Sequence, residues 1–208
     1  MRATAELALK RPRTEGEYEE ALSAIVADIQ ATSNIVDSLL FLARADDGGE
    51  LLDKKRVDLV EITRDARKRS QVLADAKRIE MRECVEAMHL WVYGDAPSLR
   101  RLFLILIDNA IKYSTSGGKV SLALDSSDGF ASFEIRDTGV GISESDLPHI
   151  FERFFRADKA RSRQVGVGLG LAIGKHIIES HCGTANVDST LGKGSLFRIR
   201  LPLISTDV

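Results

Sequence analysis

The residues of this 208-residue chain that could do chemistry lie in four short segments, two of them rich in glycine. In the segment DTGVGI, Asp137 ends a predicted strand, and Gly139 and Gly141 follow in a loop. A buried carboxylate at a strand end can accept a hydrogen bond from a ligand amino group, and glycine lets the backbone approach a ligand closely. A tight turn capped by its own aspartate is the alternative interpretation.

The second glycine-rich segment runs from Gly166 to Gly170 and precedes a predicted helix. Its backbone N–H groups, together with the positive end of the helix dipole, suit a phosphate group. A Walker loop is excluded because no Gly-Lys-Ser or Gly-Lys-Thr follows. A Rossmann turn is excluded because a polar, arginine-rich segment precedes the glycines instead of a buried strand. A surface loop without a ligand is the alternative.

The third segment, DNAIKY, lies on an apolar helix. Asn109 needs a partner if it is buried among leucine and isoleucine, and its amide oxygen could bind Mg²⁺, which prefers oxygen ligands. Lys112 could reach a phosphate group. If the segment is simply a helix end that emerges into solvent, neither residue needs a ligand.

The fourth segment, residues 148–156, holds three of the eight phenylalanines and precedes a polar, cationic stretch at 157–165. Aromatic anchors beside a polar loop are typical of a mobile lid. A satellite cluster of side chains under a surface connection is the alternative.

The elements that must position these segments can be predicted from the periods of apolar residues. Hairpins, with helices segregated from them, favour an α+β fold: a two-layer α/β sandwich in which helices cover one face of a mixed sheet. The predicted helices cover 59–75, 95–113 and a stretch that ends near 180. The predicted strands cover 56–58, 78–83, 88–93, 120–125, 130–137, 184–188 and 195–201.

Residues 1–53 read differently, with no alternating stretch and a net charge of −6 against +4 for the remainder. This contrast predicts two structural units. The first unit is a predicted α-helical hairpin with a short arm at 1–10. Its long arm, of about 32 residues, begins after Thr14, because Thr14 and Glu17 match a capping box. The apolar stripe of the long arm fits either packing on the main domain or half of a dimeric helical bundle.

Composition excludes several classes of protein. The net charge of −2 and the pI of about 6.1 argue against a general nucleic-acid binder. Cys84 and Cys182 form neither a CxxC pattern nor a disulfide framework. The longest purely apolar run, 102–107, is far shorter than the roughly 20 residues of a membrane-spanning helix. A soluble, cytoplasmic protein is therefore expected.

In their order and spacing, the four segments resemble the nucleotide-binding boxes of bacterial two-component sensor histidine kinases. DNAIKY is similar to the Asn box, DTGVGI to the first Gly box, IFERFFR to the Phe box, GVGLGLAI to the second Gly box and GKGSLFRIRLPL to the closing Gly/Ser segment. Residues 1–53 are similar to the dimerisation and histidine-phosphotransfer hairpin, and residues 54–208 to the ATP-binding catalytic domain with its Bergerat fold. The resemblance implies transfer of the ATP γ-phosphoryl group to a histidine, for relay to an aspartate of a response regulator.

The resemblance also implies roles for single residues. Asn109 would hold Mg²⁺ against the ATP phosphates, Lys112 would meet a phosphate, and Asp137 would accept a hydrogen bond from the adenine amino group. Arg153 and Arg156 would contact the γ-phosphate or another domain, and they are counted with Asn109 and Lys112 as catalytic. The residues implied to bind ATP are Asn109, Lys112, Tyr113, Asp137, Gly139, Gly141, Ile142, Gly166, Val167, Gly168, Leu169, Gly170 and Ser195.

Two features depart from the family pattern. Ile105 stands where the family often has a second asparagine, so metal binding would rest on Asn109, phosphates and waters. The four histidines, at 89, 149, 176 and 181, all lie outside residues 1–53, where the family has its phosphoacceptor box, and they are expected to be structural. The chain thus resembles a piece that begins just after that box. We expect it to bind Mg²⁺ and ATP without phosphorylating itself.

The implied partners are ATP, a cognate response regulator and, in the full-length protein, a second copy of it through the hairpin; nucleic acid is not expected. This chain would form the cytoplasmic part of an inner-membrane sensor. Membrane contact would occur only through segments outside this chain. One alternative is another ATPase of the same superfamily, against which the Phe box and the hairpin argue. The other is a degenerate nucleotide-binding or dimerisation module, to which Ile105 gives some weight.

Overall fold

The computed structural model describes residues 6, 14–46, 52–157 and 167–204. The predicted short arm at 1–10 lies outside the described residues except for Glu6, and so do Gly166 and most of the predicted lid at 157–165. The chain divides into two compact units, Met1–Gly49 and Glu50–Val208.

The first unit contains one long helix, α2, which spans Glu15–Asp46. The predicted capping box is confirmed, because Thr14 N–H donates to Glu17 Oε2 at 2.9 Å and Glu17 N–H donates to Thr14 Oγ1 at 3.4 Å. These bonds satisfy N–H groups that the first turn of a helix leaves unpaired. The apolar stripe of α2 is exposed and contains Leu22, Val26, Ile29, Val36, Leu39 and Leu40.

Among the described helices, only α2 is long and apolar enough to cross a membrane by length and composition, with a mean hydropathy of 1.3 over 18 residues. No long uninterrupted apolar run marks this helix in the sequence, because polar residues such as Ser33, Asn34 and Asp37 separate its apolar residues. A helix in the core of a soluble protein meets the same criterion. Hydropathy therefore does not distinguish a membrane span from a helix of a bundle here.

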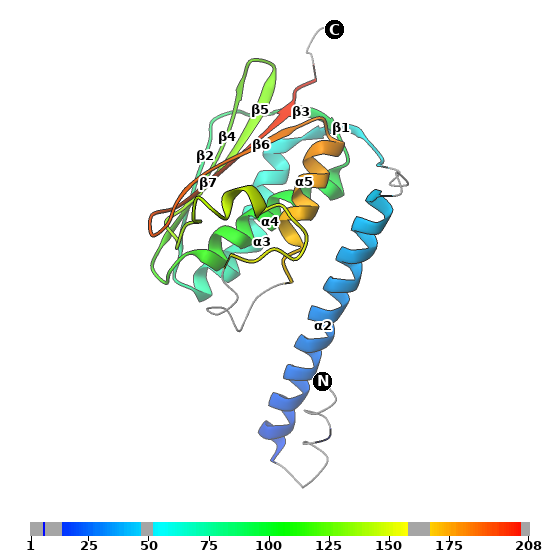
Figure 1. The fold of residues 1–208 in the computed structure, drawn as a ribbon, viewed down its shortest axis with the longest axis vertical. Helices are drawn as coiled ribbons and strands as arrows, with labels where there is room; N and C mark the ends of the chain where they lie inside the picture. The colour runs from blue at the N-terminus through cyan, green and yellow to red at the C-terminus, as the bar shows by residue number, and fades with distance from the viewer. Residues whose placement is uncertain (1–5, 7–13, 47–51, 158–166, 205–208) are drawn as a thin grey trace. The chain divides into compact units, whose positions relative to one another are not determined.

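The second unit is built on a five-stranded sheet (Figure 1). Its strands lie in the order β2 (Glu80–Val85), β4 (Lys119–Ser127), β5 (Phe130–Asp137), β7 (Gly194–Pro202) and β6 (Thr184–Thr190). The β2–β4 pair is parallel and the other three pairs are antiparallel, so the sheet is mixed, as expected. The β4–β5 turn has Asp128 and Gly129 at positive φ, as a two-residue hairpin requires.

A separate two-stranded ribbon pairs β1 (Lys55–Asp58) with β3 (Trp91–Gly94). The strand predicted at 88–93 begins later than expected, because the N–H of Leu90 donates to the Asp58 side chain instead of to a backbone carbonyl of a neighbouring strand. The strand predicted at 78–83 also begins later, since Arg78 adopts a left-handed backbone with φ of 57°. Both differences come from contacts or backbone conformations that the alternation of side chains does not reveal.

Three helices cover one face of the sheet: α3 (Leu59–Ala76), α4 (Ala96–Tyr113) and α5 (Gly170–Ser180) (Figure 1). α4 packs against both of the others and against β5. Between α4 and β5, the rings of Phe103 and Phe133 stack with centroids 4.0 Å apart. The predicted two-layer α+β sandwich is therefore confirmed.

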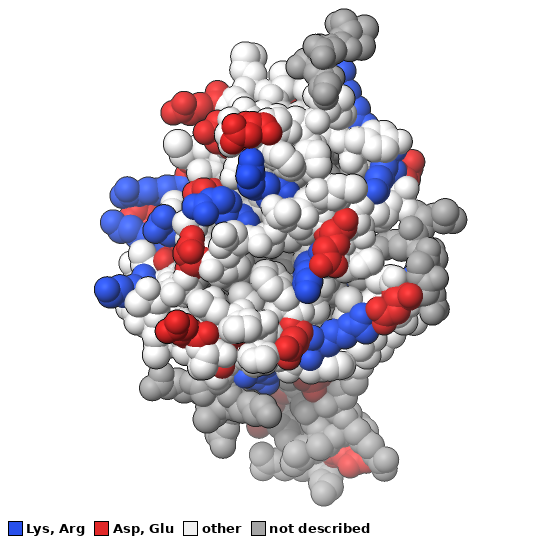
Figure 2. All heavy atoms as spheres, turned by 45° about the horizontal axis from the view of Figure 1, so that its top comes forward, with Lys and Arg blue, Asp and Glu red and all other residues white. Residues whose placement is uncertain are grey.

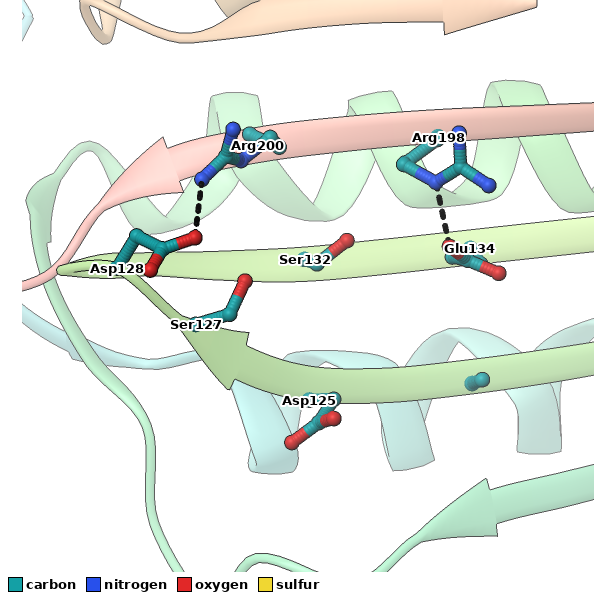
Figure 3. A pocket seen from close by; sticks show the side chains of 8 residues that line it. Asp125, Ser127, Asp128, Ser132, Glu134, Arg198 and Arg200 are labelled. Carbon is teal, nitrogen blue, oxygen red and sulfur yellow. Dashed lines mark hydrogen bonds and ion pairs between the residues drawn. The ribbon is translucent and has the colours of Figure 1, made fainter.

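The opposite face of the sheet carries paired charges (Figure 3). Arg198 Nε donates to Glu134 Oε1 at 2.5 Å, and Arg200 Nη2 lies 3.8 Å from Asp128 Oδ2. These residues help to line an open groove of about 410 Å³ across β4, β5 and β7. Basic and acidic side chains also intermingle on the face shown in Figure 2, in keeping with the net charge of −2.

Candidate functional site

The last two turns of α4 carry the first group of predicted site residues. Asn109 and Lys112 are half-buried and Tyr113 is exposed, because the apolar residues of α4 take the core-facing positions of its 3.6-residue period. The Lys112 ammonium lies 4.6 Å from the centroid of the Tyr113 ring, within the range of a cation–π contact. The buried positions of α4 are Ser98, Leu99, Leu102, Phe103, Leu106, Ile107, Ala110 and Ile111.

A lysine that the sequence prediction missed holds this end of α4. Lys77 Nζ donates to the carbonyl oxygens of Ile111 at 2.9 Å and Lys112 at 2.5 Å. The last carbonyls of a helix have no partner within it, and a cation is favourable at the negative end of the helix dipole. Burial lowers the pKa of Lys77. Lys77 comes from the end of α3, so only the packing of α3 on α4 reveals its role.

Asp137 is a buried carboxylate at the end of β5, with 6% of its surface exposed. Burial raises its pKa, although the backbone N–H groups of Gly139 and Ser195 donate to it and act in the opposite direction. The bond from Gly139 measures 2.7 Å. An ionised carboxylate offers about four acceptor positions, so Asp137 has capacity for a further donor.

The first glycine loop lies directly against the end of α4. Val140 N–H donates to the Tyr113 carbonyl at 3.1 Å. A Cβ atom on Gly139 would lie 2.4 Å from the same oxygen, so only glycine fits there. Gly141 has φ of 67°, and a Cβ on it would lie 2.0 Å from the Thr190 carbonyl. The glycines are thus required for the contact between this loop and its neighbours.

The closing hairpin completes this cluster through a second residue that the sequence prediction missed, Ser189. Its Oγ accepts the N–H of Ile142 at 2.8 Å and lies 3.0 Å from Ser195 Oγ. Ile142 and Ser195 were both predicted site residues, and Ser189 joins them. A lone serine on a β-strand carries no sequence signal of such a role, because the three residues are brought together only by the sheet register.

The Phe box and the second glycine segment are joined by their backbones. Phe154 N–H donates to the Gly168 carbonyl at 2.8 Å. Gly168 has φ of 78°, and a Cβ on it would lie 2.6 Å from the Phe155 carbonyl. Phe154 itself has a positive φ of 64° and is exposed. The two boxes therefore form one unit, whereas the intervening residues 158–166, Gly166 included, lie outside the described part of the chain.

The start of α5 follows immediately and faces α4. Leu169 is buried at the N-cap position, and Val167 and Gly170 are half-buried. Within the described residues, no side chain caps the helix, so its first N–H groups are oriented for an acceptor such as a phosphate oxygen. A Cβ on Gly170 would lie 3.4 Å from Ile105 Cγ2 on α4. Ile105, the departure from the family pattern, thus packs where the two helices meet.

The two arginines predicted as catalytic lie on the connection between η1 (Leu147–His149) and Gly168. Arg153 is exposed and Arg156 is half-buried. Both make interactions within the protein. The roles of Arg153 and Arg156 in catalysis remain predictions.

All four histidines have nearby structural partners. His89 Nδ1 lies 2.6 Å from Asp58 Oδ2, and His149 Nδ1 lies 2.7 Å from Glu152 Oε1. His176 Nε2 lies 3.1 Å from the Ser180 hydroxyl. His181 is buried and bonds to backbone groups on both ring nitrogens.

Within the described residues, no group of three or more His, Cys, Asp or Glu side chains could hold a metal ion by itself. The one predicted metal ligand, Asn109, supplies an amide oxygen, and Ile105 one turn earlier supplies none. This donor set suits Mg²⁺, which keeps waters and phosphate oxygens in its coordination shell. The groove of Figure 3 lies on the opposite face of the sheet and belongs to neither glycine loop.

Comparison with known proteins identifies the family of this chain. Residues 94–205 match the family described as "Histidine kinase-, DNA gyrase B-, and HSP90-like ATPase". The chain is 38% identical over 177 residues to the sensor histidine kinase RppB of Synechocystis sp., covering 85% of this chain and 39% of RppB. It is 37% identical over 181 residues to the sensor-like histidine kinase SenX3 of Mycobacterium tuberculosis, covering 86% of this chain and 44% of SenX3. The chain thus spans less than half the length of these relatives.

Two solved structures are also similar. The mycobacterial sensor histidine kinase MprB superposes with a TM-score of 0.64 and 35% identity, covering 72% of this chain and 98% of the MprB chain in that structure. Full-length ShkA, in complex with AMPPNP, superposes with a TM-score of 0.80 and 26% identity, covering 95% of this chain and 41% of ShkA. The residues that match the family include the end of α4, both glycine segments and the closing hairpin.

Proposed function

The chain belongs to the histidine kinase-, DNA gyrase B- and HSP90-like ATPase family, as the ATP-binding catalytic domain of a sensor histidine kinase, and from this premise we propose that the cluster around Asp137 and the start of α5 is its nucleotide site. The observation that carries this proposal is the contact of the first glycine loop with the end of α4, where Val140 N–H meets the Tyr113 carbonyl. That contact places the Asp137 carboxylate beside the helix that bears Asn109 and Lys112.

At the adenine end, the Asp137 carboxylate accepts a hydrogen bond from the exocyclic amino group of the base. Its buried position removes competing water, and the N–H groups of Gly139 and Ser195 hold the carboxylate in place. The exposed Tyr113 ring packs beside the base or ribose, and Gly141 and Ile142 line the same pocket. A buried carboxylate left without its ligand donor favours ligands that carry an amino group at this position.

At the phosphate end, the N–H groups of the first turn of α5 bind phosphate oxygens, supported by the helix dipole. Gly168 and Gly170 permit close approach of the backbone, with Gly166, Val167 and Leu169 completing the segment. Lys112 donates to a phosphate from α4. Arg153 and Arg156 meet the γ-phosphate or the domain that carries the acceptor histidine.

Asn109 would hold Mg²⁺ through its amide oxygen, with phosphates and waters as the other ligands. When bound, the ion neutralises the charge that develops on the transferred phosphoryl group. The residues of the chain contribute the rest by positioning: they orient the triphosphate, exclude water from the base and direct the γ-phosphate outward. Such positioning, together with charge neutralisation, is most of what phosphoryl transfer needs from a protein.

The phosphoryl group goes to a histidine that is not one of the four in this sequence. The structural partners of these four histidines support this, most clearly for His181, whose two ring nitrogens are both engaged. The phosphohistidine then donates to an aspartate of a response regulator. Residues 1–53 act as a dimerisation hairpin, for which the exposed apolar stripe of α2 is the surface, and residues 54–208 form the catalytic domain. We place this domain on the cytoplasmic side of a membrane-bound sensor.

Titration calorimetry with Mg²⁺ and ATP tests the site. We expect Asp137→Asn to weaken ATP binding by about tenfold or more, since roughly 1.4 kcal/mol corresponds to a factor of ten. The control is Asp125→Asn on β4, where the carboxylate is exposed and only accepts the N–H of Ser126. Equal affinity in both variants would overturn the adenine assignment.

Incubation with γ-labelled ATP tests the acceptor. Phosphohistidine survives alkali, and the proposed acceptor is not one of the four histidines of this sequence. We therefore expect no alkali-stable label on the isolated chain. A stable label on any of the four histidines would contradict the proposal.

Binding of ATP without Mg²⁺ dependence would contradict the role of Asn109.

A further inference from the structure

The segment that enters the second unit is tied to the end of α5. Lys54 Nζ donates to the carbonyl oxygen of Ser180 at 2.5 Å, across 126 positions of sequence. Ser180 is the last residue of α5, and its carbonyl belongs to the four that a helix leaves unpaired at its C-terminus. A lysine ammonium there also lies at the negative end of the helix dipole. Lys54 thus fastens the entering segment to α5.

The preceding residue is tied to the start of α4. The backbone N–H of Asp53 donates to the carboxylate of Asp95, which is 8% exposed. Asp95 is also the N-cap of α4, because its Oδ1 accepts the N–H of Ser98 at 2.8 Å. Burial would raise the pKa of Asp95, but these hydrogen bonds together lower it. The entering segment and the first turn of α4 therefore share one carboxylate.

His181 closes the connection between the two helices. Its Nε2 accepts the N–H of Asp95 at 2.9 Å, and its Nδ1 lies 2.7 Å from the carbonyl of Ile177. A carbonyl can only accept, so Nδ1 carries the proton and the ring is neutral. The ring also packs on Gly94, where an added Cβ would lie 2.7 Å from His181 Cδ2. The start of α4 and the end of α5 are thus joined by a buried bond.

The nucleotide residues lie at the opposite ends of the same two helices. Asn109 and Tyr113 are at the end of α4, and Gly170 begins α5, close to Ile105. The helices are therefore antiparallel neighbours. At 1.5 Å per residue, the eleven residues of α5 span about 16 Å. Because a packed helix moves as a rigid body, a displacement at the junction is carried to the phosphate end.

We propose that Lys54, Asp95 and His181 form a coupling junction. These positioning residues link the segment that enters the catalytic domain to the spacing between α4 and α5. Through that spacing, they influence the affinity of the nucleotide site for ATP. This inference rests on the proposed function, in which the far ends of α4 and α5 bind ATP. Coupling between two sites is reciprocal. Nucleotide binding must therefore strengthen the junction as much as the junction strengthens nucleotide binding.

The first test compares neighbouring lysines. Lys54→Met removes the ammonium and keeps the apolar stem, whereas Lys54→Arg keeps a donor. The matched control is Lys55→Met, since the exposed Lys55 ammonium lies 3.4 Å from the exposed Asp53 carboxylate. By calorimetry with Mg²⁺ and ATP on the full 208-residue chain, we expect Lys54→Met to weaken binding about fivefold, the low end of coupling factors. Lys54→Arg restores most of the affinity, and Lys55→Met stays within twofold.

The second test reads the junction directly, through hydrogen exchange of the buried Asp95 amide with and without Mg²⁺ and ATP. Reciprocity predicts slower exchange in the presence of nucleotide, although Asp95 is at the far end of α4 from Asn109. In a purely structural junction, nucleotide would slow the Asp95 amide no more than it slows amides that exchange through global unfolding, because ligand binding stabilises the whole fold. Urea unfolding of each variant separates loss of stability from loss of affinity.

The outcomes distinguish the two proposals. If Lys54→Met binds ATP as the unmodified chain does, and nucleotide slows the Asp95 amide no more than amides that exchange through global unfolding, the coupling is overturned and the nucleotide site stands. If the unmodified chain binds no ATP at millimolar concentration with Mg²⁺, the proposed function is overturned and the coupling with it.

Discussion

The carbonyl oxygen of Tyr113 lies so close to Gly139 that no side chain fits between them. A Cβ atom built on Gly139 would lie 2.4 Å from that oxygen, and the neighbouring N–H of Val140 donates to it at 3.1 Å. The last residue of α4 and the loop after β5 are thereby held together without any side-chain contact. The proposed nucleotide site depends on this backbone contact, because it sets the loop that follows Asp137 against the end of the helix that bears Asn109.

Replacing Gly139 with alanine tests that contact. The Cβ would also lie 2.7 Å from Asp137 Oδ1 and 2.8 Å from the carbonyl carbon of Tyr113, so the loop has to move. We expect a loss of about 1–3 kcal/mol in the free energy of unfolding, as for other overpacked sites. ATP affinity should fall by about tenfold or more. Urea unfolding and calorimetry measure the two effects. Gly16→Ala, in the open first turn of α2, is the control and should leave both unchanged or slightly improve stability.

Lys77→Met should loosen the end of α4. The substitution removes the ammonium that serves the carbonyls of Ile111 and Lys112, and hydrogen bonds from charged donors contribute about 1.5–3 kcal/mol. We expect a stability loss near the low end of that range, with weaker ATP binding, because Lys112 and Asn109 share the affected turns. The exposed Lys68 on the same helix provides the control variant, Lys68→Met. Equal stability of the two variants would show that Lys77 does not hold α4.

The raised pKa of Asp137 predicts a pH dependence of stability. Between its ordinary value of 3.8 and its higher value in the folded protein, the folded chain holds a proton that the unfolded chain has lost. Stability therefore falls as pH rises through this window, and the cost is fully present above the folded pKa. Relative to Asp137→Asn, the unmodified chain should become more stable as pH is lowered from 7 toward 4. Urea titrations at several pH values measure this difference, and a constant difference would contradict the prediction.

Asp58 should behave in the opposite way. Burial alone would raise its pKa, but hydrogen bonds from His89, Leu90 and Val60 outweigh burial and lower it. The carboxylate therefore contributes stability that is present above 3.8 and is lost as pH falls through the lower folded pKa. The advantage of the unmodified chain over Asp58→Asn should shrink between pH 6 and pH 3 in the same urea titrations. Growth of that advantage on acidification would be inconsistent with the hydrogen bonds described.

Much of this protein could be predicted from its sequence, because the relevant interactions are local. Thr14 and Glu17 are three residues apart and cap α2, and Asp95 caps α4 through a residue three positions on. The turn at Asp128 and Gly129 needs only their own backbone preferences. The apolar periods of α3 and α4 likewise depend on neighbouring positions, so the α+β class and the bounds of most elements followed from them.

Only the tertiary structure decided which distant residues meet. The sheet order β2-β4-β5-β7-β6 places Ser189 between Ile142 and Ser195, and the packing of α3 on α4 brings Lys77 to the site. The junction of Lys54 with Ser180 joins residues 126 positions apart. A single serine or lysine has the same sequence signature whether it faces water or a helix end. Its role is set by hydrogen-bond geometry between elements, which no local preference encodes.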